Sequence, residues 1–485
     1  MGSIRSVSIR NLNPIRAAIL YLGFGLARLG LIDRHRVVRA TDLSWPRIVT
    51  GLARMSKSAA DVAMVGIAIG PAAIAGVGFA APFHSLAFAL GGGIAGGTIA
   101  LVSQRYGAGA DEQLAMAIKA SALVAVLVTL PLVVAFWFLP GALVELIGGQ
   151  NVDAIVYGAA YLQVVALGVP LAALNLVGSR ALVGCDDAWT PMIVRAGGAI
   201  ANIVLSAVFI FGFGMGVVGA ALGTVLADAV VTAAFGIGLA RGGLPGVPFP
   251  TQVPISGPHF DRETVHQLVE IATPLVLTDL ARSGAQFPKL WIVGLFGANV
   301  VAALVIAERI RGLMGTPGWG FSLASSSLVG QELGTGAETE AEAWANDILR
   351  FAVATYVVVA VVTGVFAEQI ARLFVDDPAV VPLVVPFIYA ACLGVIFQGI
   401  EGGAVGALRA SGDTKWPLYA KLAGLYVVGI PVAYLGVITP LGVVAIYLAF
   451  VAETFVPASI TYYRLRTGAW KVVSRAYRPE VSPGD

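Results

Sequence analysis

The chain has 485 residues, of which 58% are hydrophobic and only 12% are charged, and its formal net charge is +2. Soluble domains carry about 25% charged residues, so this composition excludes an ordinary soluble protein. The small net charge gives no reason to expect a nucleic-acid partner. The two cysteines, Cys185 and Cys392, lack CxxC spacing and predict neither a disulfide framework nor a zinc site.

Apolar stretches of about 20 residues recur along the whole chain, and each can cross a hydrocarbon core about 30 Å thick. They predict an all-α polytopic membrane protein. The twelve expected transmembrane helices lie near residues 46–69, 72–103, 114–138, 155–180, 190–212, 217–240, 266–295, 299–331, 344–366, 379–408, 416–437 and 441–463.

Basic residues are unequally distributed between the two sides of these helices. If the N-terminus lies inside, the outward loops contain one basic residue, Arg372, whereas the inward segments and the tail contain many. Because positive charge is retained in the cytoplasm, we expect both termini to be cytoplasmic.

Residues 1–45 precede the first predicted span and contain seven arginines around a short apolar run. A basic segment followed by an apolar one is also the pattern of a signal peptide, but Arg28 interrupts the apolar run. We favour a cytoplasmic basic segment that lies on the anionic inner leaflet.

The chain contains an internal repeat. The stretches "PRIVTGLARMSKSAADVAMVG" (46–66) and "PLVLTDLARSGAQFPKLWIVG" (274–294) share Pro, Thr, Leu-Ala-Arg and Val-Gly at an offset of 228. Residues 103–113 match 330–340 at offset 227, and 181–191 match 407–417 at offset 226. Two copies of a six-helix unit enter the membrane from the same side, so a pseudo-two-fold axis along the membrane normal should relate them.

This repeat predicts the domain organisation. Transporters built from parallel repeats bind their substrate between the two halves. The expected parts are a basic N-terminal segment (1–45), an N-terminal lobe (46–240), a Gly/Pro-rich cytoplasmic linker (241–265), a C-terminal lobe (266–463) and a basic cytoplasmic tail (464–485).

The first predicted span contains three charged residues, Arg54, Lys57 and Asp61. A charge inside a bilayer costs several kcal/mol and usually marks a functional site. The residue equivalent to Asp61 in the second repeat is Lys289. A purely structural charge would more simply be kept or lost in both copies, so this exchange of an acid for a base favours a functional role.

Several stretches together resemble the multidrug and toxic compound extrusion (MATE) family, within the multidrug/oligosaccharidyl-lipid/polysaccharide flippase superfamily. They are the D-x-x-x-V-G element of the first span, the Q-x-x-G-x-G turn after the second, "LRASGDTKWP" (408–417) and "NIVLSAVFIFGFGMGVVGAALGT" (202–224). The resemblance covers about residues 43–463 and is closer to the DinF-like or archaeal branch. It implies twelve helices in two six-helix lobes, alternating access, and export of cationic amphiphiles in exchange for protons or sodium.

The resemblance also implies a cation-coupling site. In many members the coupling acid is an aspartate fifteen residues after a proline in the first helix, which is the spacing of Pro46 and Asp61. The proline should allow this helix to bend. The archaeal branch adds an asparagine, a second aspartate and a threonine. Asn202 and Thr224 match, but Ser206 replaces the second aspartate. A proton is therefore the expected coupling ion, with sodium as the alternative.

The NorM branch has a second cation site, in the C-terminal half. Its glutamate position is Arg282 here and its tenth-helix aspartate position is Gln398, so we do not expect that site. The acids Asp279 and Glu401 lie nearby in sequence, but not at the family positions.

Each candidate also has a structural interpretation. Asp61 could form a static pair with Lys57, one helical turn earlier, and the polar residues of the fifth and sixth helices could simply bridge helices. Arg282 could pair with Asp279. We expect the substrate cavity to be lined by Arg54, Lys57, Arg282, Lys289 and Gln398, and we expect interhelical pairs among Glu308, Arg311 and Glu453.

The leading interpretation is a proton-driven antiporter in the plasma membrane that exports amphiphilic, cationic small molecules. The alternative is a lipid-linked oligosaccharide flippase, because such proteins have basic central cavities and Lys421 adds to the cations above. A membrane prenyltransferase would need more acids than Asp186 and Asp187. The glycines of residues 91–97 lack the context of a phosphate loop. We expect a monomer in the bilayer, not an enzyme, with no cofactor, metal, nucleotide or nucleic acid.

Overall fold

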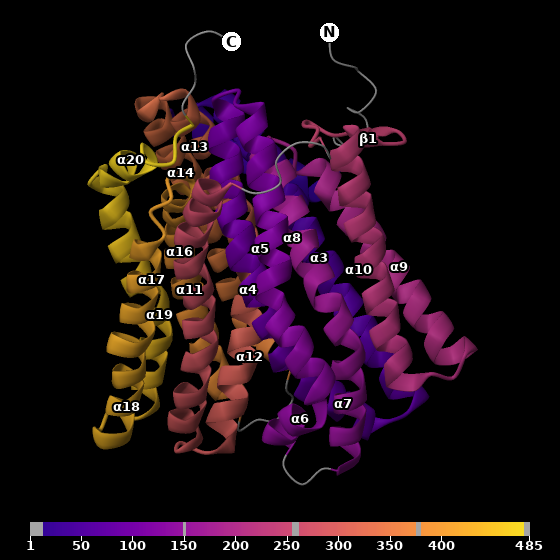
Figure 1. The fold of residues 1–485 in the computed structure, drawn as a ribbon. Helices are drawn as coiled ribbons and strands as arrows, with labels where there is room; N and C mark the ends of the chain where they lie inside the picture. The colour runs from indigo at the N-terminus through magenta and orange to yellow at the C-terminus, as the bar shows by residue number, and fades with distance from the viewer. Residues whose placement is uncertain (1–12, 149–151, 255–260, 375–379, 480–485) are drawn as a thin grey trace. The chain divides into compact units, whose positions relative to one another are not determined.

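The structure is a computed structural model that describes residues 13–148, 152–254, 261–374 and 380–479 (Figure 1). The predictions for residues 1–12, for part of the linker (255–260) and for the end of the tail (480–485) fall outside the described residues.

The first half of the chain is helical, as predicted, apart from one short hairpin that was not predicted. Its two-residue strands β1 (Gly243–Leu244) and β2 (Val247–Pro248) are antiparallel, with Gly243 opposite Pro248. Its helical elements are α2 (Pro14–Arg28), α3 (Arg34–Ala68), α4 (Pro71–Gly107), α5 (Asp111–Phe138), α6 (Pro140–Gly148), α7 (Val152–Val165), η2 (Ala166–Gly168), α8 (Val169–Gly184), α9 (Trp189–Ala207), the π-helical η3 (Val208–Gly212) and α10 (Gly216–Arg241).

The second half repeats this order of long helices. Its elements are α11 (Arg262–Gly294), α12 (Ala298–Met314), α13 (Thr316–Thr335), α14 (Glu338–Val365), α15 (Ala367–Phe374), α16 (Val381–Ala410), α17 (Lys415–Leu422), the π-helical η4 (Ala423–Gly429), α18 (Ile430–Ile438), α19 (Val443–Arg466) and α20 (Ala469–Ser474).

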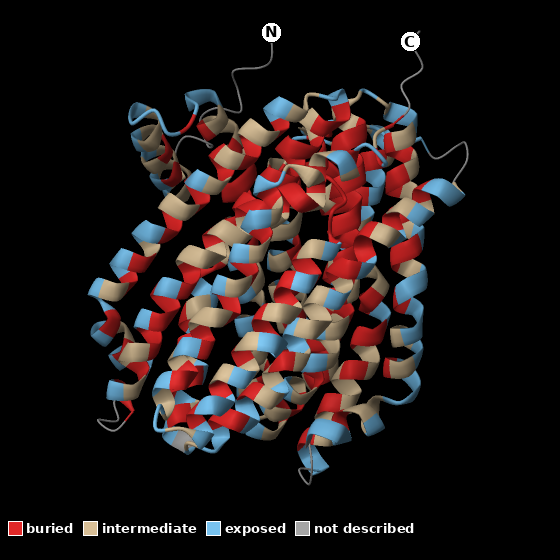
Figure 2. Ribbon diagram, turned by 90° about the vertical axis from the view of Figure 1, so that its left-hand side faces the viewer, coloured by how far each residue is buried: buried red, intermediate tan, exposed pale blue. Residues whose placement is uncertain are grey.

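Within the described residues, nine helical segments are long and apolar enough to cross a membrane. The other three predicted spans are α3, α11 and the pair α12–α13. Helices α3 and α11 contain the charged residues noted above, and the predicted eighth span is divided at Gly315, just before Pro317. In Figure 2, exposed and buried residues alternate along most helices, as expected for helices with one face toward a core and the other toward lipid.

The chain divides into two compact units. We call Val49–Val276 the N-terminal lobe, and we call the described residues up to Ile48 together with those from Leu277 to 479 the C-terminal lobe. The division falls inside α3 and inside α11, at positions related by the repeat offset of 228. The beginning of each helix thus packs with one lobe and its remainder belongs to the other, a feature that the predicted boundaries did not include.

Helices α3 and α11 also begin at equivalent residues, Arg34 and Arg262. An aspartate precedes each of them. The Asp33 carboxylate accepts a hydrogen bond from His35 N at 2.7 Å, and the Asp261 carboxylate accepts one from Thr264 N at 2.8 Å. Such side chains satisfy backbone N–H groups that a helix start leaves without partners. The repeat therefore extends back to Asp33, ahead of the predicted first span.

The beginnings of the two helices pack in equivalent ways. In the N-terminal lobe, a Cβ on Gly93 of α4 would lie 2.9 Å from Val276 N and 3.2 Å from Ala272 O. In the C-terminal lobe, a Cβ on Gly320 of α13 would lie 2.6 Å from Ser44 O. Gly93 and Gly320 are equivalent in the repeat, as are Ala272 and Ser44. Only glycine permits these close approaches. The N-terminal lobe therefore requires Gly93 where it packs against the start of α11, and the C-terminal lobe requires Gly320 where it packs against the start of α3.

The segment ahead of the first span is attached to the C-terminal lobe. Arg36 pairs with Asp347 at 2.8 Å and with Glu340 at 2.6 Å, both on α14. Arg16 pairs with Asp42 at 2.8 Å, and Arg39 donates to Gln331 at 3.2 Å. These arginines have protein partners, whereas we expected the basic segment to contact the lipid leaflet.

Candidate cation-coupling site

Asp61 lies on α3 in the interior of the N-terminal lobe, and only 8% of its surface is exposed. One helical turn further along α3, Val65 packs in an apolar cluster with Ala73 of α4, Ile210 of η3 and Val217 of α10. The carboxylate therefore needs polar partners, because an ionised group in an apolar interior is costly unless it is hydrogen-bonded.

Asn202 and Thr224 provide these partners. The Asn202 amide nitrogen donates to both carboxylate oxygens of Asp61 at 3.2 Å, and its oxygen accepts from Thr224 Oγ1 at 3.0 Å and Thr224 N at 3.1 Å. The opposite amide orientation would turn the Asn202 oxygen toward the carboxylate, so the hydrogen-bonding pattern decides between the two. The structure thus brings together three residues that are far apart in the sequence, on α3, α9 and α10.

The fourth residue of the predicted coupling site is Ser206, and Lys57, a predicted cavity residue, lies near Asp61 in the sequence of α3. Ser206 lies one turn after Asn202 on α9, is fully buried and interacts with the Asp61 carboxylate. Lys57 lies one turn before Asp61 on the same helix. The Ser206 hydroxyl can donate or accept a hydrogen bond, and Lys57 places a positive charge on the Asp61 side of α3.

Two polar residues of this lobe were missed in the sequence. Tyr161 of α7 packs against the apolar cluster that contains Val65, interacts electrostatically with Asp61 and forms a side-chain hydrogen bond with Thr224. Asp228 of α10 accepts a hydrogen bond from Asn175 Nδ2 at 3.2 Å. Asp228 could have been found, because it is an ionisable residue within a predicted span. A tyrosine in an apolar helix gives no comparable signal.

The remaining candidates on α3 differ in their surroundings. The Arg54 guanidinium lies over the Phe88 ring of α4, 4.9 Å from its centroid, so it makes a cation–π contact inside the N-terminal lobe. Pro46 lies within α3, which continues as a helix through it, two residues before the division between the lobes.

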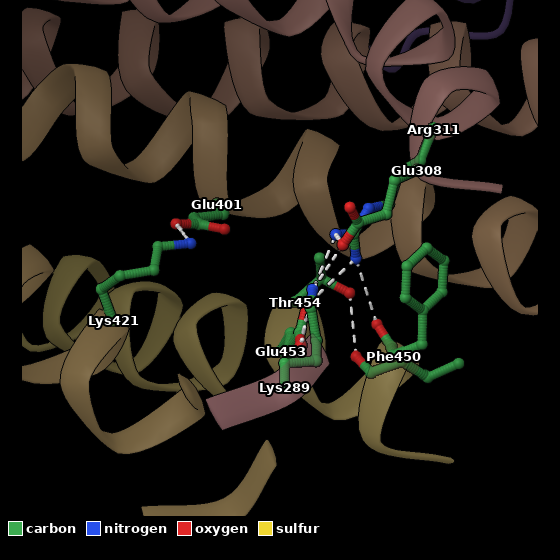
Figure 3. Close-up of polar contacts among 9 residues, drawn as sticks. Lys289, Glu308, Arg311, Glu401, Lys421, Phe450, Glu453 and Thr454 are labelled. Atoms are coloured by element: carbon green, nitrogen blue, oxygen red, sulfur yellow. Dashed lines mark hydrogen bonds and ion pairs between the residues drawn. The ribbon is translucent and has the colours of Figure 1, made fainter. Parts of the chain in front are cut away.

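The position equivalent to Asp61 has a different environment (Figure 3). Lys289 of α11 is 6% exposed, and its Nζ lies 2.5 Å from Glu308 Oε1 and 3.3 Å from Glu453 Oε1. Arg311 pairs with Glu453 at 3.4 Å and stacks 3.8 Å above the Phe450 ring. The predicted interhelical pairs of Glu308, Arg311 and Glu453 are therefore present, and Lys289 joins them.

The other C-terminal candidates are dispersed. Arg282 is exposed on α11, and Gln398 Oε1 has no hydrogen-bond partner among the residues described. Lys421 is buried and pairs with Glu401 at 2.6 Å. The flippase alternative depended on cations in both halves of the chain, and the pairing of two of them, Lys289 and Lys421, with glutamates weakens that support.

Comparison with known proteins identifies the family. The signature of the MatE family matches residues 46–208 and 274–435, one copy in each repeat. The chain belongs to the MatE family. It is therefore a membrane transporter and not an enzyme, as the resemblance implied.

Relatives and solved structures extend this match over most of the chain. A Bradyrhizobium diazoefficiens protein named as a probable multidrug resistance protein NorM is 26% identical over 450 residues, which are 90% of this chain and 94% of that protein. The multidrug resistance protein PmpM of Pseudomonas aeruginosa is 26% identical over 411 residues, 84% of this chain and 85% of that protein. A crystal structure of a MATE transporter in a bent conformation is 23% identical, with a TM-score of 0.83, and the match covers 91% of this chain and 97% of that one.

These matches show the two-lobe transporter fold. The site that we infer in the N-terminal lobe depends on the residues described above, since solved structures at this level of identity carry information about the fold alone.

Proposed function

We propose that this transporter is a proton-driven antiporter that exports amphiphilic, cationic small molecules by alternating access. The observation that carries the proposal is the buried Asp61 carboxylate with its Asn202 and Thr224 partners. The multidrug resistance names of the relatives support the substrate class. An acid held by neutral hydrogen-bond donors can exist with or without its proton, and a coupling site needs both states.

The hydrogen bonds suggest how one proton acts on both the helix and the substrate. Ionised Asp61 accepts from the Asn202 amide and attracts a cationic substrate. Protonated Asp61 is a neutral donor and acceptor, so it loses that attraction while it can still bond to Asn202. Pro46 makes bending of α3 inexpensive, and α3 carries Asp61. Protonation would thus release the substrate and change the shape of α3 in one step.

We further propose that the protein works as a monomer in the plasma membrane with both termini in the cytoplasm. The distribution of Lys and Arg between the predicted loops supports this orientation. A proton remains our preferred coupling ion because Ser206 leaves one carboxylate where the archaeal pattern has two.

The test is transport of a cationic dye into proteoliposomes under an imposed pH gradient. The variant Asp61→Asn keeps the hydrogen bonds of a protonated acid and should retain the fold, but it should abolish gradient-driven transport. The matched control is Asp228→Asn, which alters another hydrogen-bonded aspartate of the N-terminal lobe and should preserve coupling. Wild-type transport rates in Asp61→Asn at normal expression would refute the proposal.

A further inference from the structure

The C-terminal lobe contains a compact group of four charged side chains on three helices, which we call the Lys289 cluster. It consists of Lys289 on α11, Glu308 and Arg311 on α12, and Glu453 on α19 (Figure 3). The side chains of Lys289 and Glu453 are 8% and 9% exposed, and that of Glu308 is 25% exposed. Two positive and two negative charges make the cluster neutral as a whole.

The Lys289 ammonium has the central position in this cluster. It lies 2.5 Å from Glu308 Oε1, and it lies 3.3 and 3.4 Å from the two carboxylate oxygens of Glu453. Three carboxylate oxygens from two helices therefore converge on one small cation. Convergent oxygen atoms are also what hard metal cations require of a protein site.

Arg311 is the second cation of this cluster. Its guanidinium lies 3.4 Å from Glu453 Oε2 and 3.9 Å from Glu308 Oε1. It is held over the Phe450 ring, 3.8 Å from the ring centroid, and it donates a hydrogen bond to the Phe450 carbonyl oxygen at 3.4 Å. Without the Lys289 ammonium, the carboxylates of Glu308 and Glu453 would share one arginine. Two neighbouring carboxylates oppose each other's ionisation.

We propose that Glu308 and Glu453 form a site for a monovalent metal cation in the C-terminal lobe, and that the chain keeps this site filled with its own Lys289 ammonium. The site is at the repeat position equivalent to Asp61. The tethered ammonium excludes sodium from the C-terminal lobe. This inference rests on the proposed function in one respect: if the C-terminal site is closed to sodium, ion coupling is confined to the N-terminal lobe.

The test removes the ammonium and asks whether sodium replaces it. Lys289→Met is purified in detergent, and its melting temperature is compared in sodium chloride and in choline chloride at equal ionic strength. The wild-type protein should melt at the same temperature in both salts. Lys289→Met should melt lower than wild type in choline chloride, and about 200 mM sodium should raise its melting temperature by roughly 3 °C or more.

Two further variants act as controls. Lys421→Met removes the other buried lysine, but it leaves the single carboxylate of Glu401 and should show no sodium effect. The double variant Lys289→Met/Glu308→Gln restores the charge balance, so it should also lose the sodium effect. These measurements involve no transport, so they can fail independently of the Asp61 experiment.

Three results would overturn the proposal. They are a sodium-independent melting temperature for Lys289→Met, an equal sodium effect in Lys421→Met, and a sodium effect in the wild type that Glu308→Gln removes. If Lys289→Met does not fold in choline chloride, Lys289→Gln provides the same comparison with a smaller perturbation. If neither variant folds even in sodium chloride, sodium does not replace the ammonium and the proposal is wrong.

Discussion

Asp61 and Lys289 occupy equivalent positions in two copies of one repeat, but the two lobes treat their charges differently. In the N-terminal lobe a single acid is held by the neutral donor of Asn202. In the C-terminal lobe a base is held between two acids, and both acids also pair with Arg311. Neutral partners tolerate a change of protonation, whereas a balanced group of buried ion pairs resists any change of charge. If the proposed function is correct, the N-terminal lobe responds to protons while the Lys289 cluster keeps its charges fixed.

The largest effect should follow from breaking the fixed cluster. Glu453→Gln leaves Lys289 and Arg311 with only Glu308, so a buried positive charge is uncompensated. We expect the free energy of unfolding to fall by about 3 kcal/mol, measured by thermal or denaturant unfolding in detergent. Asp279→Asn on α11 is the control and should cost far less. A small decrease in the free energy of unfolding for Glu453→Gln would show that the charges of the Lys289 cluster do not depend on one another.

Removing the donor to Asp61 should affect transport more than stability. Asn202→Leu deletes both hydrogen bonds to the carboxylate, and a hydrogen bond to a charged group contributes about 1.5–3 kcal/mol. We expect gradient-driven dye transport to fall by about 10- to 100-fold. Asn175→Leu, which deletes the donor to Asp228, should leave coupling intact. Equal losses in both variants would mean that Asn202 has no special relation to Asp61.

The caps of α3 and α11 allow a comparison of the two repeats outside the membrane. Asp261 accepts hydrogen bonds from Thr264 Oγ1 at 2.6 Å and Thr264 N at 2.8 Å, whereas Asp33 accepts from His35 N. Replacing Asp261 by alanine should lower the free energy of unfolding by about 1 kcal/mol. Asp33→Ala should lower the free energy of unfolding by less, because only the His35 N–H group loses its hydrogen-bond acceptor.

The pH dependence of the Asp261 contribution gives a second check. The Thr264 side chain and backbone donate hydrogen bonds that hold the pKa of Asp261 below its usual value. A lowered pKa in the folded state means that the stabilisation is complete above the usual aspartate value and is lost as the pH falls through the folded-state value. The difference between wild type and Asp261→Ala should therefore disappear in acid. A difference that grows in acid would contradict this assignment.

The smallest effect should come from Lys57. Its positive charge, one turn before Asp61, favours release of the proton, so Lys57→Ala should move the pH optimum of dye transport upward by about half a unit. Arg282→Ala removes an exposed cation from the other repeat and should not move the optimum. A downward shift in Lys57→Ala would argue that Lys57 acts on the substrate and not on Asp61.

Much of the fold follows from the sequence because apolar length and internal repetition are local signals. The predicted spans correspond to long helical segments, and the match between residues 46–66 and 274–294 relates α3 to α11. The similarity of Asp33 and Asp261 was also available, but the arginines around Asp33 suggested a surface segment. The packing of each helix start with the opposite lobe depends on distant contacts such as those of Gly93 and Gly320, which no local pattern reveals.

The two sites differ in how far they could be predicted. The group around Asp61 could be proposed because Asn202 and Thr224 lie in recognisable stretches. The partners of Lys289 were harder to assign, because Glu308 and Glu453 are 19 and 164 residues away in the sequence. Lys289 and Arg282 were consequently expected to line the substrate cavity, with a pair between Arg282 and Asp279 as the structural alternative. Burial and pairing change the meaning of a charge, and both are properties of the folded chain.

The most direct test of the difference between the lobes is to count protons released when a cationic substrate binds to the purified protein in weakly buffered detergent solution. We expect the wild type to release about one proton, as for one acid that exchanges its proton for a substrate. We expect no release from Asp61→Asn and wild-type release from Glu308→Gln. Undiminished release from Asp61→Asn, or its loss in Glu308→Gln, would contradict the claim that coupling resides in the N-terminal lobe.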